Sequence, residues 1–399
     1  MSLRPLTLTA LASSFLLLSA CDGAARNSAP ASADSTVQQA GTDGTAEAAE
    51  ETDTIEGVPF ASTAVATFDE PWALAFLPDG SLLVTEKAGV LKHVTLPGGE
   101  AREISGVPEV GYSGQGGFGD IVVHPQFAEN GLVYFSYAED GEGGRGAAVA
   151  RARLDSETGA LQDVDVIWRQ VPKVSGNGHY AHRIAFGPDG MLWISSGDRQ
   201  KFDPAQDMAS NMGKLLRLND DGSVPADNPF ADQGEIASQV WALGLRNPLG
   251  IAFDGDGQLW EIEMGPAGGD ELNLIERGGN YGYPIVSDGN HYDGRPMPDH
   301  ATRPEFIKPQ ISWTPVISPS SLMVYSGTLF PEWTGNAFAS GLSGQTLVRI
   351  ELDGATAREA ERFAMGGRIR GVRQGPDGAL WVIEDGKDGR LIRLSPREG

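Results

Sequence analysis

The sequence is poor in cysteine, and this scarcity excludes several kinds of site. Cys21 is the single cysteine among 399 residues, so the chain cannot form an internal disulfide. The sequence also lacks a Cys-x-x-Cys pair and any Cys/His cluster with the spacing of a zinc ligand set. We therefore expect neither a structural zinc site nor an iron–sulfur cluster.

Positive charge is scarce as well. The chain has 30 Lys and Arg residues against 54 Asp and Glu residues, which gives a formal net charge of −24 at pH 7. A field of this sign repels the phosphate backbone of nucleic acids and the anionic surface of a bilayer. No nucleic acid is therefore expected among the partners.

The hydrophobic stretch near the N-terminus, from Leu6 to Leu18, is too short to span a bilayer. It follows Arg4 and ends on Leu18-Ser19-Ala20-Cys21, which resembles a bacterial lipobox. We expect residues 1–20 to be a lipoprotein signal peptide and Cys21 to be acylated. The protein would then be exported and held by its lipid anchor at the periplasmic face of a bacterial membrane. The alternative is an ordinary signal peptide with a cysteine there by chance.

The following segment has almost no large apolar residues. Between Asp22 and Glu56, eight acidic residues stand against Arg26 alone, and only Val37 and Ile55 are large and apolar. Such a segment buries too little surface to offset the entropy lost on ordering. We expect residues 21–56 to form a disordered acidic tether and residues 57–399 to form the folded domain.

Glycine and proline, by contrast, are abundant, with 53 and 25 residues. Both interrupt helices and both occupy turns between strands, so the composition favours β structure. A pattern of apolar run, turn and apolar run recurs, and its clearest copies are Leu74–Gly80, Ile184–Gly190 and Val372–Gly378. Looser copies pass through Gly131, Gly257 and Gly335.

These six turns predict six hairpins, because Asp-Gly and Asn-Gly accept the positive φ of a tight turn. Six copies within residues 57–399 correspond to about 57 residues per unit, which suits a four-stranded blade. The alternative is a sandwich in which the turns are incidental. We predict an all-β, six-bladed β-propeller, whose loops bring distant residues together at one end of a central channel.

Histidine is rare, and one histidine stands out as a candidate general base. His179 lies in the glycine-rich segment Gly176–Arg183, just before the third hairpin. Imidazole titrates near neutrality and accepts a hydroxyl proton without a large change of pKa. Asp198 ends the outgoing strand of the same hairpin, where a carboxylate can orient the imidazole. His182 is a weaker candidate, because it sits at the start of the strand.

Two further segments carry cations that suit a carboxylate ligand. Arg246 and Asn247 precede one strand, and Arg368 and Arg370 lie at i and i+2 of another. Guanidinium groups bind planar anions through two hydrogen bonds, which suggests a small polycarboxylate. The alternative is a solvated rim that pairs with the many acidic residues.

A glycine-rich acidic segment, Gly265–Glu271, precedes Asn280–Pro284 and exposes backbone carbonyls. Calcium prefers such oxygen ligands, although the EF-hand spacing is absent.

Five segments together resemble the soluble aldose sugar dehydrogenases of the glucose/sorbosone dehydrogenase type, which use pyrroloquinoline quinone (PQQ). The resemblance covers roughly residues 60–396. Its most specific segments, in the order of the family, are Gly114–Asp120, Gly244–Gly250, Gly265–Asn273, Gly279–Pro284 and Arg368–Arg370.

The resemblance implies a PQQ- and calcium-dependent oxidation of aldose sugars at C1 to lactones. His179 would take the C1 hydroxyl proton while hydride passes to the quinone, and Asp198 would orient His179. An external acceptor, a quinone or a cytochrome, would receive the electrons. The residues implied in cofactor binding are Gln115, Arg246, Asn247, Arg368 and Arg370, with Trp313 beside the ring. The implied calcium ligands are the carbonyls of Gly265 and Pro266, and Glu271 and Tyr281 for a further structural ion.

Three positions depart from the family's pattern. Ser343 stands where a lysine commonly reaches the cofactor, Gly178 where an acid or amide often precedes the catalytic histidine, and the region of Gln310 lacks a tyrosine. Two other functions stay open: a periplasmic binding propeller without cofactor, and a calcium-dependent lactonase-like hydrolase.

Overall fold

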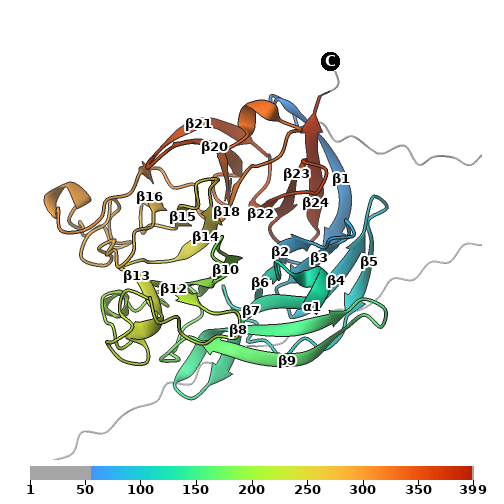
Figure 1. Cartoon of the computed structure of the whole chain (residues 1–399). Helices are drawn as coiled ribbons and strands as arrows, with labels where there is room; N and C mark the ends of the chain where they lie inside the picture. The colour runs from blue at the N-terminus through green and yellow to red at the C-terminus, as the bar shows by residue number, and fades with distance from the viewer. Residues whose placement is uncertain (1–54, 398–399) are drawn as a thin grey trace, which may run out of the picture. The chain divides into compact units, whose positions relative to one another are not determined.

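The computed structural model describes residues 55–397, which form six sheets of four antiparallel strands. Figure 1 shows the sheets around one ring, with β2, β6, β10, β14, β18 and β22 at its middle. The prediction of an all-β, six-bladed propeller is confirmed. The predicted signal peptide, the acylated Cys21 and nearly all of the tether lie outside the described residues. Within residues 55–397, no helix is long and apolar enough to cross a membrane.

The first three sheets follow one another along the chain, each with its innermost strand first. Sheet 1 consists of β2 (Pro71–Phe76), β3 (Leu82–Glu86), β4 (Val90–Thr95) and β5 (Glu100–Ile104). Sheet 2 consists of β6 (Phe118–Val123), β7 (Leu132–Gly141), β8 (Gly144–Asp155) and β9 (Ala160–Arg169). Sheet 3 consists of β10 (Ala181–Phe186), β11 (Leu192–Ser196), β12 (Lys214–Leu218) and β13 (Val240–Leu243).

The remaining sheets continue this order. Sheet 4 consists of β14 (Pro248–Phe253), β15 (Leu259–Glu263), β16 (Asp270–Leu274) and β17 (Ile311–Trp313). Sheet 5 consists of β18 (Pro319–Val324), β19 (Ala337–Gly341), β20 (Thr346–Asp353) and β21 (Thr356–Ala364). Sheet 6 consists of β22 (Ile369–Gln374), β23 (Leu380–Glu384), β24 (Gly389–Pro396) and β1 (Phe60–Phe68).

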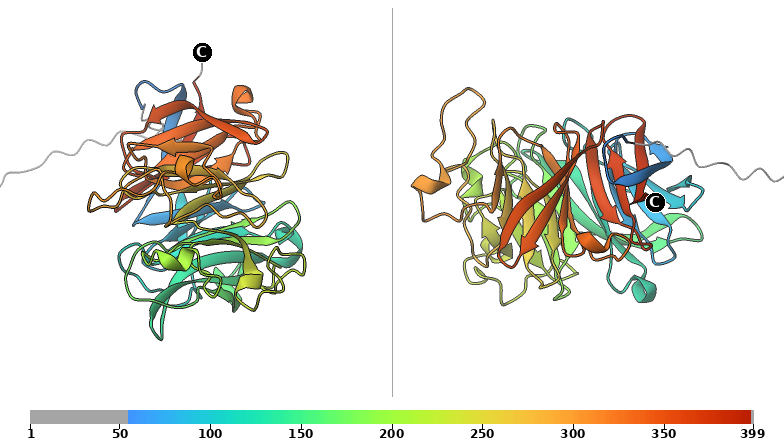
Figure 2. Two further views of the ribbon diagram at one scale, coloured as in Figure 1. Left: turned by 90° about the vertical axis from the view of Figure 1, so that its left-hand side faces the viewer. Right: turned by 90° about the horizontal axis from the view of Figure 1, so that it is seen from above.

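Short helices occupy the connections. They are α1 (Phe127–Asn130) and the 3-10 helices η1 (Asp203–Ala205), η2 (Ala237–Gln239), η3 (His300–Thr302) and η4 (Pro331–Trp333). Figure 2 shows the long connection that contains η3 standing out from the strands.

The ring is closed by its two ends. β1 pairs antiparallel with β24, so the strand nearest the N-terminus completes the last sheet, and β22 contacts β2 of the first sheet.

All six predicted turns join the first two strands of a sheet. Their glycines adopt positive φ: Gly80, Gly131, Gly190, Gly257, Gly335 and Gly378 have values of 87°, 66°, 77°, 80°, 84° and 81°. Because every innermost strand ends in such a turn, the opposite end of the ring carries the loops that precede these strands. Of the candidate site residues, Gln115, His179, Arg246, Asn247 and Arg368 lie on those loops.

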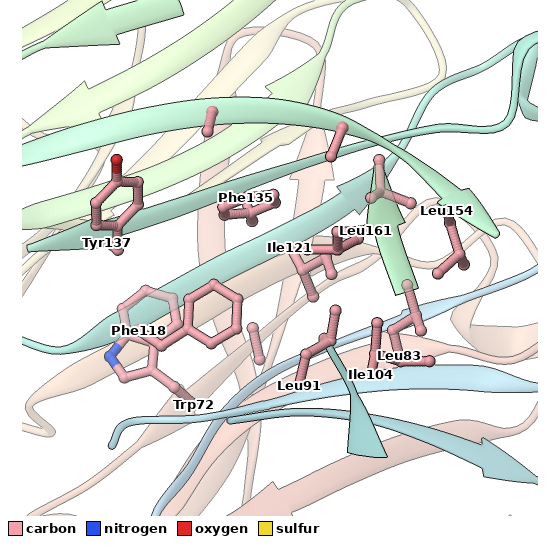
Figure 3. Packing of buried hydrophobic residues seen from close by; sticks show 14 of the residues in the cluster. Trp72, Leu83, Leu91, Ile104, Phe118, Ile121, Phe135, Tyr137, Leu154 and Leu161 are labelled. Carbon is pink, nitrogen blue, oxygen red and sulfur yellow. The ribbon is translucent and has the colours of Figure 1, made fainter. Parts of the chain in front are cut away.

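Neighbouring sheets are held by apolar side chains. Figure 3 shows Leu83 and Leu91 of sheet 1 packed near Ile121 of sheet 2. The rings of Phe118 and Phe135 meet edge to face with centroids 5.6 Å apart. Burying such a side chain stabilises the fold by about 1.5–3 kcal/mol.

Candidate functional site

A cavity of about 330 Å³, here called the central cavity, opens where the innermost strands begin. Five of its lining residues are the first or second residue of their strands, in sheets 1, 3, 4 and 6. These residues are Trp72, Ala181, His182, Leu249 and Arg370. Gln115 before β6 and Ser318 before β18 add the two remaining sheets. Every blade therefore contributes to one cavity, as a discontinuous site requires.

The predicted pair of His179 and Asp198 is formed. Nδ1 of His179 lies 2.7 Å from Oδ1 of Asp198, and His179 is only 6% exposed. The backbone N–H of His179 donates to Oε1 of Gln115 at 2.6 Å. The Asp198 carboxylate also accepts from the backbone N–H groups of Gln200 and Phe202, at 3.0 and 3.3 Å. These contacts fix both partners before any ligand arrives.

The surroundings keep His179 neutral. Burial lowers the pKa of His179 below its usual value; the hydrogen bond to Asp198 opposes this effect, and the charge of Arg246 reinforces it. An uncharged imidazole whose Nδ1 donates to Asp198 leaves Nε2 as the proton acceptor. The pair can therefore act as an oriented general base.

His182 is a poor competitor for this role. Its Nδ1 lies 2.7 Å from Oγ of Ser136, and its ring stacks on Trp72 with centroids 5.0 Å apart. Complete burial lowers the pKa of His182 to about 3, with Arg183 adding to the effect. Such a ring accepts a proton only weakly near neutral pH.

Asn247 lines the central cavity, and Arg246 lines two further cavities that are described below. Oε2 of Glu263 accepts from both of their backbone N–H groups, at 2.5 and 3.0 Å. Arg246 donates to the carbonyl of Met264 at 2.8 Å, yet Nε of Arg246 and Oδ1 of Asn247 are buried without a hydrogen-bond partner in the described chain. Unsatisfied buried polar atoms at a cavity indicate a polar ligand. Glu263 was not predicted from the sequence, because its position on a strand resembles that of an ordinary buried residue.

Arg368 and Arg370 share one carboxylate. Both line the central cavity, and their Nε atoms donate to Asp385 at 2.8 Å each. Burial alone would raise the pKa of Asp385, but Arg370 and Arg368 hold it below its usual value. The two guanidinium groups thus meet at the cavity, as predicted, with a counter-ion beside them.

A second cavity, of about 270 Å³, is lined by His179, Arg246 and Pro266 and is here called the aromatic cavity. Its other walls include Phe202, Tyr283, His291 and Tyr292. Phe202 and Tyr283 stack with centroids 6.2 Å apart, while the Tyr292 side chain is 75% exposed. These aromatic walls were not predicted from the sequence, because they come from loops far apart in the chain. The cavity offers apolar ring faces next to the proposed base.

The four predicted calcium residues gather around a third, very small cavity. Gly265, Pro266, Glu271 and Tyr281 all line a space of about 10 Å³, which has room for about one water molecule or ion. Glu263 lines it too, and burial raises the pKa of both glutamates.

Two of the carbonyls there already have partners. The Gly265 carbonyl accepts from Arg246 at 2.7 Å, and the Tyr281 carbonyl lies 3.0 Å from Nε2 of His300. Within residues 55–397, no three His, Cys, Asp or Glu side chains are arranged to hold a metal ion. The oxygen donors suit calcium, but a cation there would depend on backbone carbonyls.

Trp313 is not brought to the central cavity. It lies on β17, the outermost strand of sheet 4, and is 4% exposed within a cluster that includes Trp260 and Leu322. Its indole N–H donates to Oε2 of Glu359 on β21 at 2.6 Å. The expectation that its side chain lies beside a ligand ring is therefore corrected: the indole packs between sheets 4 and 5.

The chain matches known proteins over most of its length. The family model described as Glucose / Sorbosone dehydrogenase matches residues 68–393. The chain is 37% identical over 338 residues to the Aldose sugar dehydrogenase YliI of Escherichia coli strain K12, covering 82% of this chain and 91% of that protein.

Two solved structures of aldose sugar dehydrogenases have the same fold. The apo-form of the soluble enzyme from Escherichia coli gives a TM-score of 0.80 at 36% identity and covers 85% of this chain and 100% of the other. The PQQ-bound form from Streptomyces coelicolor gives 0.71 at 31% identity and covers 83% and 96%. The expected family is confirmed, and the chain belongs to the Glucose / Sorbosone dehydrogenase family.

Proposed function

We propose that this protein oxidises aldose sugars at C1 to lactones, with PQQ and calcium as its cofactors. The observation that carries the proposal is the pair His179–Asp198 at the wall of the aromatic cavity, together with Arg368 and Arg370 at the central cavity. The relative from Streptomyces coelicolor, whose structure is described as PQQ-bound, supports the choice of cofactor.

The chemistry of the central cavity fits a flat tricarboxylate. Arg368 and Arg370 offer guanidinium groups, Gln115 and Asn247 offer side-chain amides, and the buried Oδ1 of Asn247 has no hydrogen-bond partner among the described residues. When bound, the quinone supplies the two-electron acceptor that a C1 oxidation needs. The chain's own residues would bind and orient the sugar and accept its proton.

In this proposal His179 removes the proton of the C1 hydroxyl. Nδ1 is held by Asp198, so Nε2 receives the proton, and the carboxylate stabilises the imidazolium that forms. The aromatic cavity would hold the sugar, with Phe202 and Tyr283 covering its apolar face and limiting access of water. Calcium would bind the carbonyls of Gly265 and Pro266; Glu271 and Tyr281, which the family resemblance assigns to a second ion, line the same space, which has room for about one ion.

The test is reconstitution of the purified full-length protein with PQQ and calcium chloride. Reduction of an artificial electron acceptor should then depend on added PQQ and on an aldose, and EDTA should abolish it until calcium is restored. Absence of turnover with glucose and a panel of other aldoses would contradict the proposal. Failure to take up PQQ saturably would favour a binding propeller, and lactone hydrolysis without an electron acceptor would favour a hydrolase.

We also propose that the protein is exported and lipid-anchored at the periplasmic face of the membrane, where an external quinone or cytochrome would receive its electrons. The sequence before Cys21 supports this proposal. In bacterial cells fed a labelled fatty acid, the label should appear on the wild-type protein and not on Cys21→Ser. Release of the wild-type protein into the soluble periplasm would contradict the anchor.

A further inference from the structure

The central cavity contains a lysine from a blade that carries none of the predicted cofactor residues. Lys87 follows β3 in sheet 1 and lines the same cavity as Arg368 and Arg370. The lysine side chain is 19% exposed. It is thus a partly buried cation whose ion-pair partner, Glu70, also lines the cavity.

The backbone of Lys87 is tightly held. Its N–H donates to the carbonyl of Glu70 at 3.0 Å, and its own carbonyl accepts from Phe118 at 2.9 Å. Gly117 packs so closely that a Cβ there would lie 2.2 Å from the Lys87 carbonyl oxygen. The position of Lys87 at the cavity is therefore set by sheets 1 and 2 together.

The side chain is oriented by a carboxylate and an aromatic ring. Nζ of Lys87 lies 3.7 Å from Oε1 of Glu70 and 5.5 Å from the centre of the Tyr112 ring. The Tyr112 hydroxyl donates to the other oxygen of Glu70. The carboxylate of Glu70 neutralises the charge of Lys87, as the carboxylate of Asp385 neutralises the charges of the two arginines.

Backbone hydrogen bonds connect the loop that carries Glu70 with the loop that carries Asp385. The backbone N–H of Glu70 donates to the carbonyl of Gly386 at 3.0 Å, and Gly386 directly follows Asp385. The backbone N–H of Asp385 donates to the carbonyl of Arg368 at 2.8 Å. Lys87 and the arginine pair therefore stand side by side on neighbouring loops.

Position 343, where the family resemblance implies a cofactor lysine, carries no charge in this chain. Oγ of Ser343 lies 2.6 Å from Oγ of Ser318, and Ser318 lines the central cavity. A lysine at 343 would be within reach of the cavity, so one cation is absent on the side of sheet 5. Lys87 supplies a cation from sheet 1 instead.

We infer that Lys87 binds a carboxylate of the PQQ cofactor and replaces the cationic contact that Ser343 lacks. The inference rests on the proposed function, because it needs PQQ in the central cavity. An ammonium group on a partly buried carboxylate forms a charge-assisted hydrogen bond, which is stronger than a neutral one.

The experiment is titration of the metal-loaded, PQQ-free protein with PQQ, followed by the absorbance of the bound quinone. Lys87→Met should weaken binding about 10- to 100-fold, and Lys87→Arg should keep most of the affinity. The matched control is Lys92→Met: Lys92 lies in the same sheet and also faces glutamates, at 3.5 and 4.0 Å, but it does not line the cavity. Its affinity should equal that of the wild type.

Two further measurements make the inference specific. Adding Ser343→Lys to Lys87→Met should recover affinity, which also shows that the variant is folded. The PQQ affinity of the wild type should fall more steeply with salt than that of Lys87→Met, because the variant has one ionic contact fewer for salt to screen.

The outcomes separate the inference from the proposed function. Saturable PQQ binding by the wild type with equal affinity in Lys87→Met would overturn the inference and leave the function standing. Absence of PQQ binding by the wild type would overturn both. Equal weakening by Lys92→Met, or no recovery by Ser343→Lys, would also count against a specific contact of Lys87.

Discussion

At the scale of single residues, the site depends on a backbone that leaves little freedom. His179 has a positive φ of 50°, and Arg199 donates its backbone N–H to the His179 carbonyl at 3.2 Å. A Cβ at Gly197 would lie 2.1 Å from that carbonyl oxygen. The imidazole is therefore placed by the loop before β10 and the loop after β11, and Asp198 only completes its orientation.

Replacement of His179 tests its role directly. The variant His179→Gln should lower kcat by about 10²–10⁴-fold, because a general base typically contributes that much. PQQ affinity should stay unchanged, since His179 does not line the central cavity. Steady-state kinetics and PQQ titration measure the two quantities. A loss of affinity as large as the loss of rate would assign His179 to cofactor binding instead.

The lowered pKa of His179 predicts a pH profile. The base works only when unprotonated, so kcat/KM should hold at neutral pH and fall as pH drops through a value below the usual 6.5 of histidine. The same shift affects stability: below pH 6.5 the unfolded chain binds a proton that the folded chain resists, so folding weakens with acid. In Asp198→Asn, which removes the carboxylate that favours the protonated ring, the pH midpoint of the kcat/KM profile should move lower still. A wild-type midpoint at or above 6.5 would contradict the assignment.

At the scale of elements, three hairpins place the indole of a tryptophan against their turns. Trp260 donates its indole N–H to Asp254 at 2.8 Å. In sheets 3 and 6 a glycine stands at the position of Asp254. A Cβ at Gly187 would lie 2.7 Å from Nε1 of Trp193, and a Cβ at Gly375 would lie 2.4 Å from Nε1 of Trp381. Glycine before Pro-Asp-Gly is therefore required where a tryptophan follows in the next strand.

This requirement predicts a selective loss of stability. Gly187→Ala should lower the free energy of unfolding by about 1–3 kcal/mol, because the new Cβ displaces Trp193. The control is Gly255→Ala, whose Cβ meets nothing within 4 Å and whose φ is not positive. Denaturant unfolding of both variants measures the difference. Equal stability of the two would show that the tryptophan adjusts without strain.

At the scale of the whole propeller, one buried arginine connects every innermost strand. Arg183 of β10 donates to Asp120 of β6 at 3.1 Å, to the carbonyl of Leu249 on β14 at 2.8 Å, and to the carbonyls of Ser320 on β18 and Arg370 on β22. Its guanidinium carbon lies 3.9 Å from the Trp72 ring on β2. Burial lowers the pKa of Arg183 to about 10 while Asp120 opposes the effect, so the group stays charged at neutral pH.

Removal of this charge should therefore destabilise the ring as a unit. Arg183→Met should lower the free energy of unfolding by about 3–5 kcal/mol, since it leaves Asp120 buried with its closest ion-pair partner removed. Adding Asp120→Asn should recover part of the loss. Arg358→Met, at a residue whose side chain is 68% exposed, should change stability by less than about 0.5 kcal/mol. Unchanged stability of Arg183→Met in denaturant unfolding would refute this role.

The sequence by itself determined the architecture, because its signals are local. An Asp-Gly or Asn-Gly turn needs only adjacent residues to select positive φ, so five such turns and the weaker Thr334-Gly335 turn were enough to predict six blades. The pair His179 and Asp198 was predictable for the same reason, since both flank one hairpin.

Only the tertiary structure decided which side chains meet across the ring. Trp313 turned out to pack between two sheets, Lys87 to face the same cavity as Arg370, and Arg183 to touch strands of all the other blades. These contacts join residues far apart in the chain, and no spacing along the sequence encodes them. They follow from the closure of the ring, which brings the loops of all six blades to one end of the channel.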